Sequence, residues 1–205
     1  MTSPDHYFSA EPASPDQLRT LRVRLRGPEV SVQAAAGVFS GDRLDQGTRV
    51  LLDAVADPPG TGTLVDVGCG WGPLTLAMAQ ASPGARVLGV DVNARARDLT
   101  ARNAAALGLD NVEVLTPEEA LAALPPAGID EIWSNPPIRI GKSALHELLR
   151  TWLGRLAPSG RAHLVVQKNL GADSLHRWLA AELGTDVERT ASAKGFRVLT
   201  VRPGG

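Results

Sequence analysis

The chain has 205 residues, of which 43% are hydrophobic and 21% are charged, and its formal net charge is −1. This length suits one domain with a substantial core, and the charge balance argues against a protein that coats nucleic acid through bulk charge. Cys69 is the single cysteine, which excludes an internal disulfide framework. Because no apolar run has the length of a signal-peptide core or a membrane span, we expect a cytoplasmic protein.

The first part of the chain has the pattern of paired strands. In "LRTLRVRLR", residues 18–26, apolar residues alternate with arginine, which predicts a strand with one apolar and one basic face. Gly27 and Pro28 interrupt the pattern, and "EVSVQ" then alternates again, as in a β-hairpin. We therefore expect residues 1–35 to form an extension with a β-hairpin and residues 36–205 to form the main domain.

The main domain has the pattern of an α/β fold. From residue 61 onward strand patterns alternate with helical ones, which predicts βαβ units and a mostly parallel, Rossmann-like sheet with helices on both faces. No helix separates the last two strands, so the last strand should be antiparallel. The expected strands cover residues 63–68, 85–92, 111–115, 129–135, 160–167, 185–191 and 195–201, and the expected helices cover residues 48–56, 72–82, 94–108, 117–124, 142–158 and 171–183.

A glycine-rich loop follows the first strand of this sheet. "VDVGCGWGPL" places Gly68, Gly70 and Gly72 between a strand and a helix, where the backbone can turn sharply and a ligand can approach closely. About twenty residues later Asp91 ends the next strand, where a carboxylate can accept hydrogen bonds from both hydroxyls of a ribose. The loop and Asp91 together indicate a ligand that contains adenosine, either a dinucleotide or another adenosine cofactor.

A second motif follows the fourth strand of the sheet. In "WSNPPIRIGK" the proline after Asn135 holds that residue in an extended conformation, and neither Pro136 nor Pro137 has an N–H to donate. The Asn135 side-chain oxygen and the Pro136 carbonyl should therefore form a rigid pair of acceptors. Such a pair can bind the hydrogens of an exocyclic or amide amine and orient the nitrogen lone pair for attack on a methyl group.

These motifs resemble those of class I S-adenosylmethionine-dependent methyltransferases, whose first motif has the spacing G-x-G-x-G with an acidic residue two positions earlier, here Asp66. The segments "HYFS", "GVFSGDRLDQGTRVLLDAV", "SNPPIRIGK" and "KGFRVL" resemble the methyltransferase small-domain family, which includes ribosomal RNA guanine-N2 methyltransferases. The resemblance covers nearly the whole chain. It implies a seven-stranded fold with a reversed last strand, S-adenosylmethionine as methyl donor, and an exocyclic amine of RNA as acceptor, most simply guanine N2 of ribosomal RNA.

The resemblance assigns roles to individual residues. Asp66 would lie near the methionine part of the cofactor, and Cys69 would be a small filler in the loop. Ile138 stands where an aromatic residue commonly stacks on the target base, so that stacking should come from Phe39 or Phe196, although Phe196 also fits a core position. The candidate cofactor-binding residues are Asp66, Gly68, Cys69, Gly70, Gly72, Asp91, Val92, Thr116 and Asn135; the candidate catalytic residues are Asn135, Pro136 and Pro137; the candidate substrate-binding residues are Phe39, Ile138, Arg139, Lys142 and Lys168.

Other functions remain open at this stage. Related Asn-Pro-Pro corners also serve transfer to adenine N6 or to a glutamine side chain of a protein. The absence of the aromatic residue at Ile138 is the one feature that favours a module that binds cofactor or RNA without turnover. A dehydrogenase is a further alternative, but its fingerprint has the spacing G-x-G-x-x-G. The histidines have no ligand spacing, so we expect no metal site.

Overall fold

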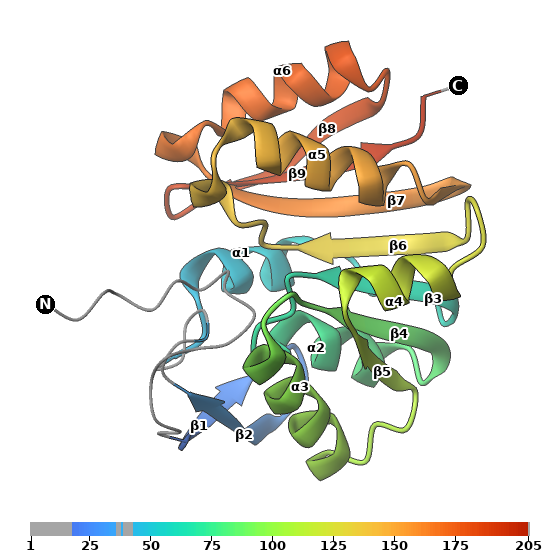
Figure 1. The fold of residues 1–205 in the computed structure, drawn as a ribbon. Helices are drawn as coiled ribbons and strands as arrows, with labels where there is room; N and C mark the ends of the chain where they lie inside the picture. Colours follow the sequence, from blue (N-terminus) through green and yellow to red (C-terminus); the bar gives the residue numbers. More distant parts are fainter. Residues whose placement is uncertain (1–17, 36–37, 39–42, 205) are drawn as a thin grey trace, which may run out of the picture.

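The structure is a computed structural model that describes residues 18–35, 38 and 43–204. Seven strands form one sheet in the order β5-β4-β3-β6-β7-β9-β8 (Figure 1). Their bounds are Thr61–Val67 for β3, Gly84–Val90 for β4, Val112–Leu115 for β5, Ile129–Ser134 for β6, Leu156–Gln167 for β7, Asp186–Ala193 for β8 and Phe196–Arg202 for β9.

The directions of the strands confirm the predicted Rossmann-like sheet with an antiparallel last strand. Strands β3 to β7 pair in parallel, whereas β9 runs antiparallel to both of its neighbours, β7 and β8. The turn between β8 and β9 uses Lys194 and Gly195, both with positive φ, as tight hairpin turns require. Strands β3 and β4 end in runs of buried residues because helices cover both faces of the sheet.

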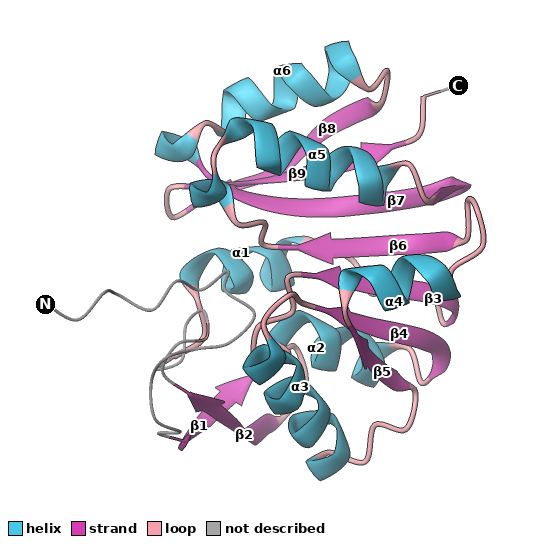
Figure 2. Ribbon diagram, in the orientation of Figure 1, coloured by secondary structure: helices cyan, strands magenta, loops and turns pink. Residues whose placement is uncertain are grey.

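In the part of the chain that the structure describes, six helices form two layers around the sheet (Figure 2). Helices α1, α2 and α3 share one buried apolar cluster on one face, and α4, α5 and α6 share the other cluster on the opposite face. Their bounds are Gln46–Ala54 for α1, Pro73–Ala81 for α2, Ala94–Ala106 for α3, Pro117–Ala123 for α4, Lys142–Leu153 for α5 and Ala172–Glu182 for α6, with short 3-10 turns η1 at Ile138–Ile140 and η2 at Lys168–Leu170. No helix in the described part of the chain is long and apolar enough to cross a bilayer.

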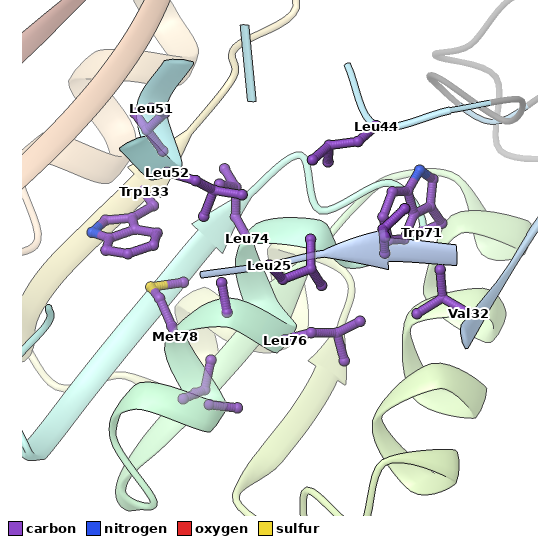
Figure 3. Close-up of a cluster of buried hydrophobic side chains, with 14 of the residues drawn as sticks. Leu25, Val32, Leu44, Leu51, Leu52, Trp71, Leu74, Leu76, Met78 and Trp133 are labelled. Atoms are coloured by element: carbon purple, nitrogen blue, oxygen red, sulfur yellow. The ribbon is translucent and has the colours of Figure 1, made fainter. Parts of the chain in front are cut away.

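The hairpin of β1 (Leu18–Arg24) and β2 (Glu29–Ala35) forms a sheet of its own but shares the core of the main domain. Leu25 and Val32 lie in the same buried cluster as Trp71 and Leu76 (Figure 3). The Asn103 side chain of α3 also bonds both backbone groups of Gln33, accepting from its N–H at 2.7 Å and donating to its carbonyl at 2.9 Å. The predicted hairpin is therefore held against α3 by apolar packing and by a paired hydrogen bond.

The end expected for one helix, residue 158, and the start expected for the strand after it, residue 160, are both wrong. The helix expected over residues 142–158 ends at Leu153, and β7 already begins at Leu156, which pairs with Ile129 of β6. Apolar residues at positions 152, 153 and 156 also fit a helical period, so the pattern alone did not mark the end. Gly154 caps the helix, and Pro158 has no N–H with which to continue it.

Candidate functional site

A cavity of about 1140 Å³ opens beyond the carboxyl ends of β3, β4 and β6. These strands meet at the point where the strand order reverses, which is where open α/β sheets bind their ligands. Residues predicted from two separate motifs line this one cavity. They are Gly68, Gly70, Asp91, Val92, Asn135, Pro136, Pro137, Ile138 and Arg139.

The glycine loop lines the cavity through Gly68 and Gly70. Gly68 and Gly70 have φ values of 83° and 60°, in the left-handed region that only glycine adopts without strain. The N–H groups of Gly68 and Cys69 both donate to the carbonyl of Val90, which fixes the loop against the end of β4. A Cβ at Gly68 would meet open space, so a ligand can approach the backbone there.

Gly72 has a different role from the one expected. It lies just before α2 with a φ of 97°, and it does not line the cavity. A Cβ at this position would lie 3.1 Å from side-chain atoms of Thr100 on α3. Gly72 therefore allows α2 and α3 to pack closely, whereas Gly68 and Gly70 face the ligand space.

Asp91 lies directly after β4 at the edge of the cavity. Its Oδ2 accepts a hydrogen bond from the Gly70 N–H at 3.0 Å, and its Oδ1 accepts one from the Asn93 N–H at 2.9 Å. Burial raises the pKa of this carboxyl, although the two backbone bonds oppose that effect. Each oxygen keeps capacity for one more hydrogen bond, as two ribose hydroxyls would need. Val92, a large apolar side chain that is 46% exposed, lies next to it on the cavity wall.

Asp66 is a fully buried carboxyl with one satisfied oxygen. Its Oδ2 accepts from the N–H and the hydroxyl of Thr75, at 2.9 and 2.7 Å. Its Oδ1 has no hydrogen-bond partner among the described residues. Burial raises the pKa of Asp66 to about 7. The residue borders a small cavity of about 20 Å³, room for one water molecule, which Gly68, Gly70 and Asn135 also line.

Cys69 lies within the same loop as a buried thiol. Burial raises its pKa well above the usual value, and nearby Asp91 adds to this effect. Its sulfur accepts a hydrogen bond from the Thr100 hydroxyl at 3.5 Å. A buried thiol with a raised pKa is a poor nucleophile, in keeping with a filling role.

The Asn135 amide is held in one orientation by two residues that the sequence analysis did not single out. Its Nδ2 donates to Oδ2 of Asp45 at 2.8 Å and to Oγ1 of Thr48 at 3.2 Å. Both amide hydrogens are therefore used, and the Oδ1 atom remains as an acceptor. Asp45 is itself fixed because it caps α1, accepting from the Thr48 N–H at 2.9 Å.

The Pro136 carbonyl is less free than the sequence suggested. The Ile138 N–H donates to it at 2.8 Å, across a turn in which Pro137 has φ −74° and ψ 76°. This is an inverse γ-turn, and it occupies one of the two lone pairs of the carbonyl oxygen. One lone pair of the Pro136 carbonyl therefore remains for the acceptor role that the sequence analysis predicts.

Phe196 supplies an aromatic face on the cavity wall. It is the first residue of β9, is half-buried, and packs against the core cluster as well as lining the cavity. Its ring lies so close to Gly47 of α1 that a Cβ there would be 2.9 Å from it. Ile138 also lines the cavity, whereas Phe39, together with His6 and Tyr7, lies outside the described residues.

Of the remaining candidate residues, only some line the cavity. Arg139 lines the cavity and is exposed, whereas Lys142 and Lys168 are exposed first residues of α5 and η2 that do not line it. Thr116 caps α4 through a reciprocal bond with Glu119, and its neighbour Pro117 is the residue that faces the cavity. Within the described ranges no group of three potential metal ligands occurs.

Sequence comparisons give the family of the chain and two kinds of relative. The family model described as "Methyltransferase small domain" matches residues 29–200. The uncharacterized protein YbxB of Bacillus subtilis is 32% identical over 198 residues, which are 97% of this chain and 98% of that protein. Ribosomal RNA small subunit methyltransferase C of Pseudomonas aeruginosa (strain LESB58) is 35% identical over 199 residues, 93% of this chain and 57% of that enzyme.

A solved structure of a C-type methyltransferase also resembles this chain. The 16S rRNA N2 G1207 methyltransferase RsmC of T. thermophilus, in complex with AdoMet and guanosine, superimposes with a TM-score of 0.77 at 26% identity. The match covers 94% of this chain and 52% of that enzyme. The chain thus spans about half the length of the C-type methyltransferases that it matches, and nearly all of YbxB.

Proposed function

Because the chain belongs to the methyltransferase small-domain family, we propose that it methylates the exocyclic N2 amine of a guanine in small-subunit ribosomal RNA, with S-adenosylmethionine as methyl donor. The observation that carries this proposal is the anchored Asn135 amide. Its free oxygen lies in the same cavity as the glycine loop and Asp91. The C-type relatives and the RsmC complex with guanosine support the choice of RNA and of guanine.

The residues at the site fit S-adenosylmethionine. Asp91 has two oxygens available for the ribose hydroxyls, and the open space at Gly68 lets the cofactor lie against the backbone. The unpartnered Oδ1 of Asp66 would accept from the cationic amino group of the methionine part through a water in the small cavity. Val92 would pack against the adenine. Bound there, the cofactor supplies a methyl group activated by its positively charged sulfur.

The protein's part in the reaction is to position and polarise the acceptor amine. Oδ1 of Asn135 and the remaining lone pair of the Pro136 carbonyl would accept the two N–H groups of the amine, so that the nitrogen lone pair points at the methyl carbon. The nitrogen lone pair would then form the new N–C bond as the C–S bonding pair remained with the donor sulfur, and the proton lost from the nitrogen would pass to water. Fixed acceptors stabilise the positive charge that develops on that nitrogen.

The experiment that tests this proposal is transfer of a tritiated methyl group to ribosomal RNA from cells that lack the gene. We expect incorporation as N2-methylguanosine, identified by mass spectrometry of the nucleosides. Asn135→Ala should lower kcat by about 100-fold or more, as loss of a transition-state donor or acceptor does, and change affinity for S-adenosylhomocysteine less than about threefold, since Asn135 acts on the amine.

Other outcomes identify other functions. Incorporation into adenine or into protein glutamine would replace the proposed acceptor. Binding of cofactor without transfer to RNA, DNA or protein would indicate a non-catalytic module. A dehydrogenase would bind NAD in preference to S-adenosylhomocysteine, which the family match does not favour. A cytoplasmic location, expected from the sequence, would bring the enzyme to its RNA.

A further inference from the structure

We propose that Asp45 selects guanine, because its Oδ1 accepts a hydrogen bond from the ring N1–H while its Oδ2 holds Asn135. This inference rests on the proposed function and specifies how the acceptor base is chosen. The sequence alone assigns Asp45 no role at the site. This residue is 90 positions from Asn135 in the sequence.

The two oxygens of Asp45 have different surroundings. Oδ2 accepts from the Thr48 N–H at 2.9 Å and from Asn135 Nδ2 at 2.8 Å. Oδ1 accepts no hydrogen bond within the described ranges. Asp45 is half-buried and lines the large cavity as well as the small one. A carboxylate oxygen with spare acceptor capacity therefore lies beside the amide whose own oxygen is to bind the amine.

The wall around Asp45 has the composition of a base-binding site. A Cβ at Gly47 would lie 2.9 Å from Asp45 Oδ2 and 2.9 Å from the Phe196 ring, so the carboxylate and the ring are packed around the same glycine. An aromatic face combined with acceptors at its edge is how proteins bind unstacked bases, by stacking and by hydrogen bonds to the base edge.

The order of donors and acceptors on this wall matches guanine. In guanine the N2 amine lies next to N1–H, so the edge presents donors side by side to the oxygens of Asn135 and Asp45. In adenine and cytosine the ring nitrogen beside the amine is an acceptor, and in a glutamine amide the neighbour is a carbonyl oxygen. Each of these would place a lone pair against a carboxylate, and a site built for a donor rejects ligands that lack it.

A nucleoside pair isolates the N1–H contact. Guanosine and 2-aminopurine riboside both carry the 2-amino group, but N1 of 2-aminopurine is an acceptor. We would titrate each into the full chain with S-adenosylhomocysteine present and measure affinity by calorimetry. The wild-type protein should bind guanosine at least about tenfold more tightly, the size of one good base-edge contact. Because 2-aminopurine also lacks O6, the decisive quantity is the change in this ratio on mutation.

The substitution Asp45→Asn keeps one oxygen to accept from Thr48 and Asn135 and replaces the other with an NH₂ donor. Asparagine is also a good helix cap, so folding should be retained. We expect the preference for guanosine to fall by about tenfold or more. The matched control, Thr48→Val, removes the other acceptor of the Asn135 amide and should weaken both nucleosides without changing their ratio.

Three results would overturn the inference. The ratio of the two nucleoside affinities could be the same in Asp45→Asn as in the wild-type protein, the wild-type protein could bind both nucleosides equally well, or it could bind neither. Failure of the proposed function would look different. In that case the wild-type protein would prefer guanosine and lose this preference on Asp45→Asn, yet would transfer no methyl group to ribosomal RNA from the deletion strain.

Discussion

The substitution Asp66→Asn should change how the stability of the protein depends on pH. Burial raises the pKa of Asp66 from 3.8 to about 7 in the folded protein, so between these values the folded state holds a proton that the unfolded chain releases. A raised carboxyl pKa stabilises the folded state most below the unfolded value, and this contribution is lost as the pH rises through the folded value. Asparagine does not titrate, so the variant should lack this contribution to the pH dependence of stability.

The size of the effect follows from the shift. A displacement of about 3 pKa units corresponds to about 4 kcal/mol between the two limits, at about 1.4 kcal/mol per unit. Over the accessible range from about pH 5 to about pH 8, roughly 3 kcal/mol of this should be seen. The free energy of unfolding of Asp66→Asn minus that of the wild-type protein should rise by about this amount as the pH increases, because groups that do not interact with Asp66 cancel in the difference.

Urea unfolding followed by circular dichroism at several pH values between about 5 and 8 measures this difference. A second variant tests the cause of the shift. The Thr75 hydroxyl donates to Asp66 Oδ2 and lowers its pKa, so Thr75→Val should raise that pKa and extend the loss of stability to higher pH. A difference between Asp66→Asn and the wild-type protein that stays constant across this range would refute the reasoning.

Two further predictions concern the cavity wall and the glycine loop. Phe196→Leu should raise the KM for RNA by about tenfold, the value of one base stack, and leave the affinity for the cofactor unchanged. Phe196→Tyr, which keeps an aromatic ring, should keep the wild-type KM. An unchanged KM in Phe196→Leu would mean that the ring only packs against the core. Gly72→Ala should lower the free energy of unfolding by about 1–2 kcal/mol, because its φ of 97° and the nearby Thr100 side chain both disfavour a Cβ. Gly60→Ala, at a position with open space, is its control in the same urea titration, and equal stabilities would contradict the argument.

The sequence allowed the glycine loop, Asp91 and Asn135 to be placed at one edge of the sheet, because the carboxyl ends of parallel strands share that edge. The glycine loop, Asp91 and Asn135 each follow a different strand, and strands that alternate with helices all end on the same side of the sheet. Local patterns therefore sufficed to bring distant motifs together. The same patterns predicted the antiparallel last strand.

The partners of Asn135 were not predictable in this way. The sequence places Asp45 in a loop and Thr48 at the start of an expected helix, and only the packing of α1 against the sheet brings them to Asn135. The occupied lone pair of Pro136 depends on the turn at Pro137, which the two prolines do not dictate. The division at residue 35 stays a prediction, since the hairpin shares its buried cluster with α2 and α3. Side-chain contacts between elements that are far apart in the sequence could not be predicted from local patterns, and the structure was needed to find them.

The Asp66 and Asp91 carboxyls lie close enough to interact, which bears on the charge of the ligand that the proposed site would bind. Asp66 and Asp91 are both raised in pKa by burial, and the charge of Asp91 raises the pKa of Asp66 further. Without a ligand each carboxylate therefore opposes ionisation of the other. A ligand with a positive charge near Asp66 relieves this repulsion and favours the ionised form, so its binding should release a proton below about pH 7.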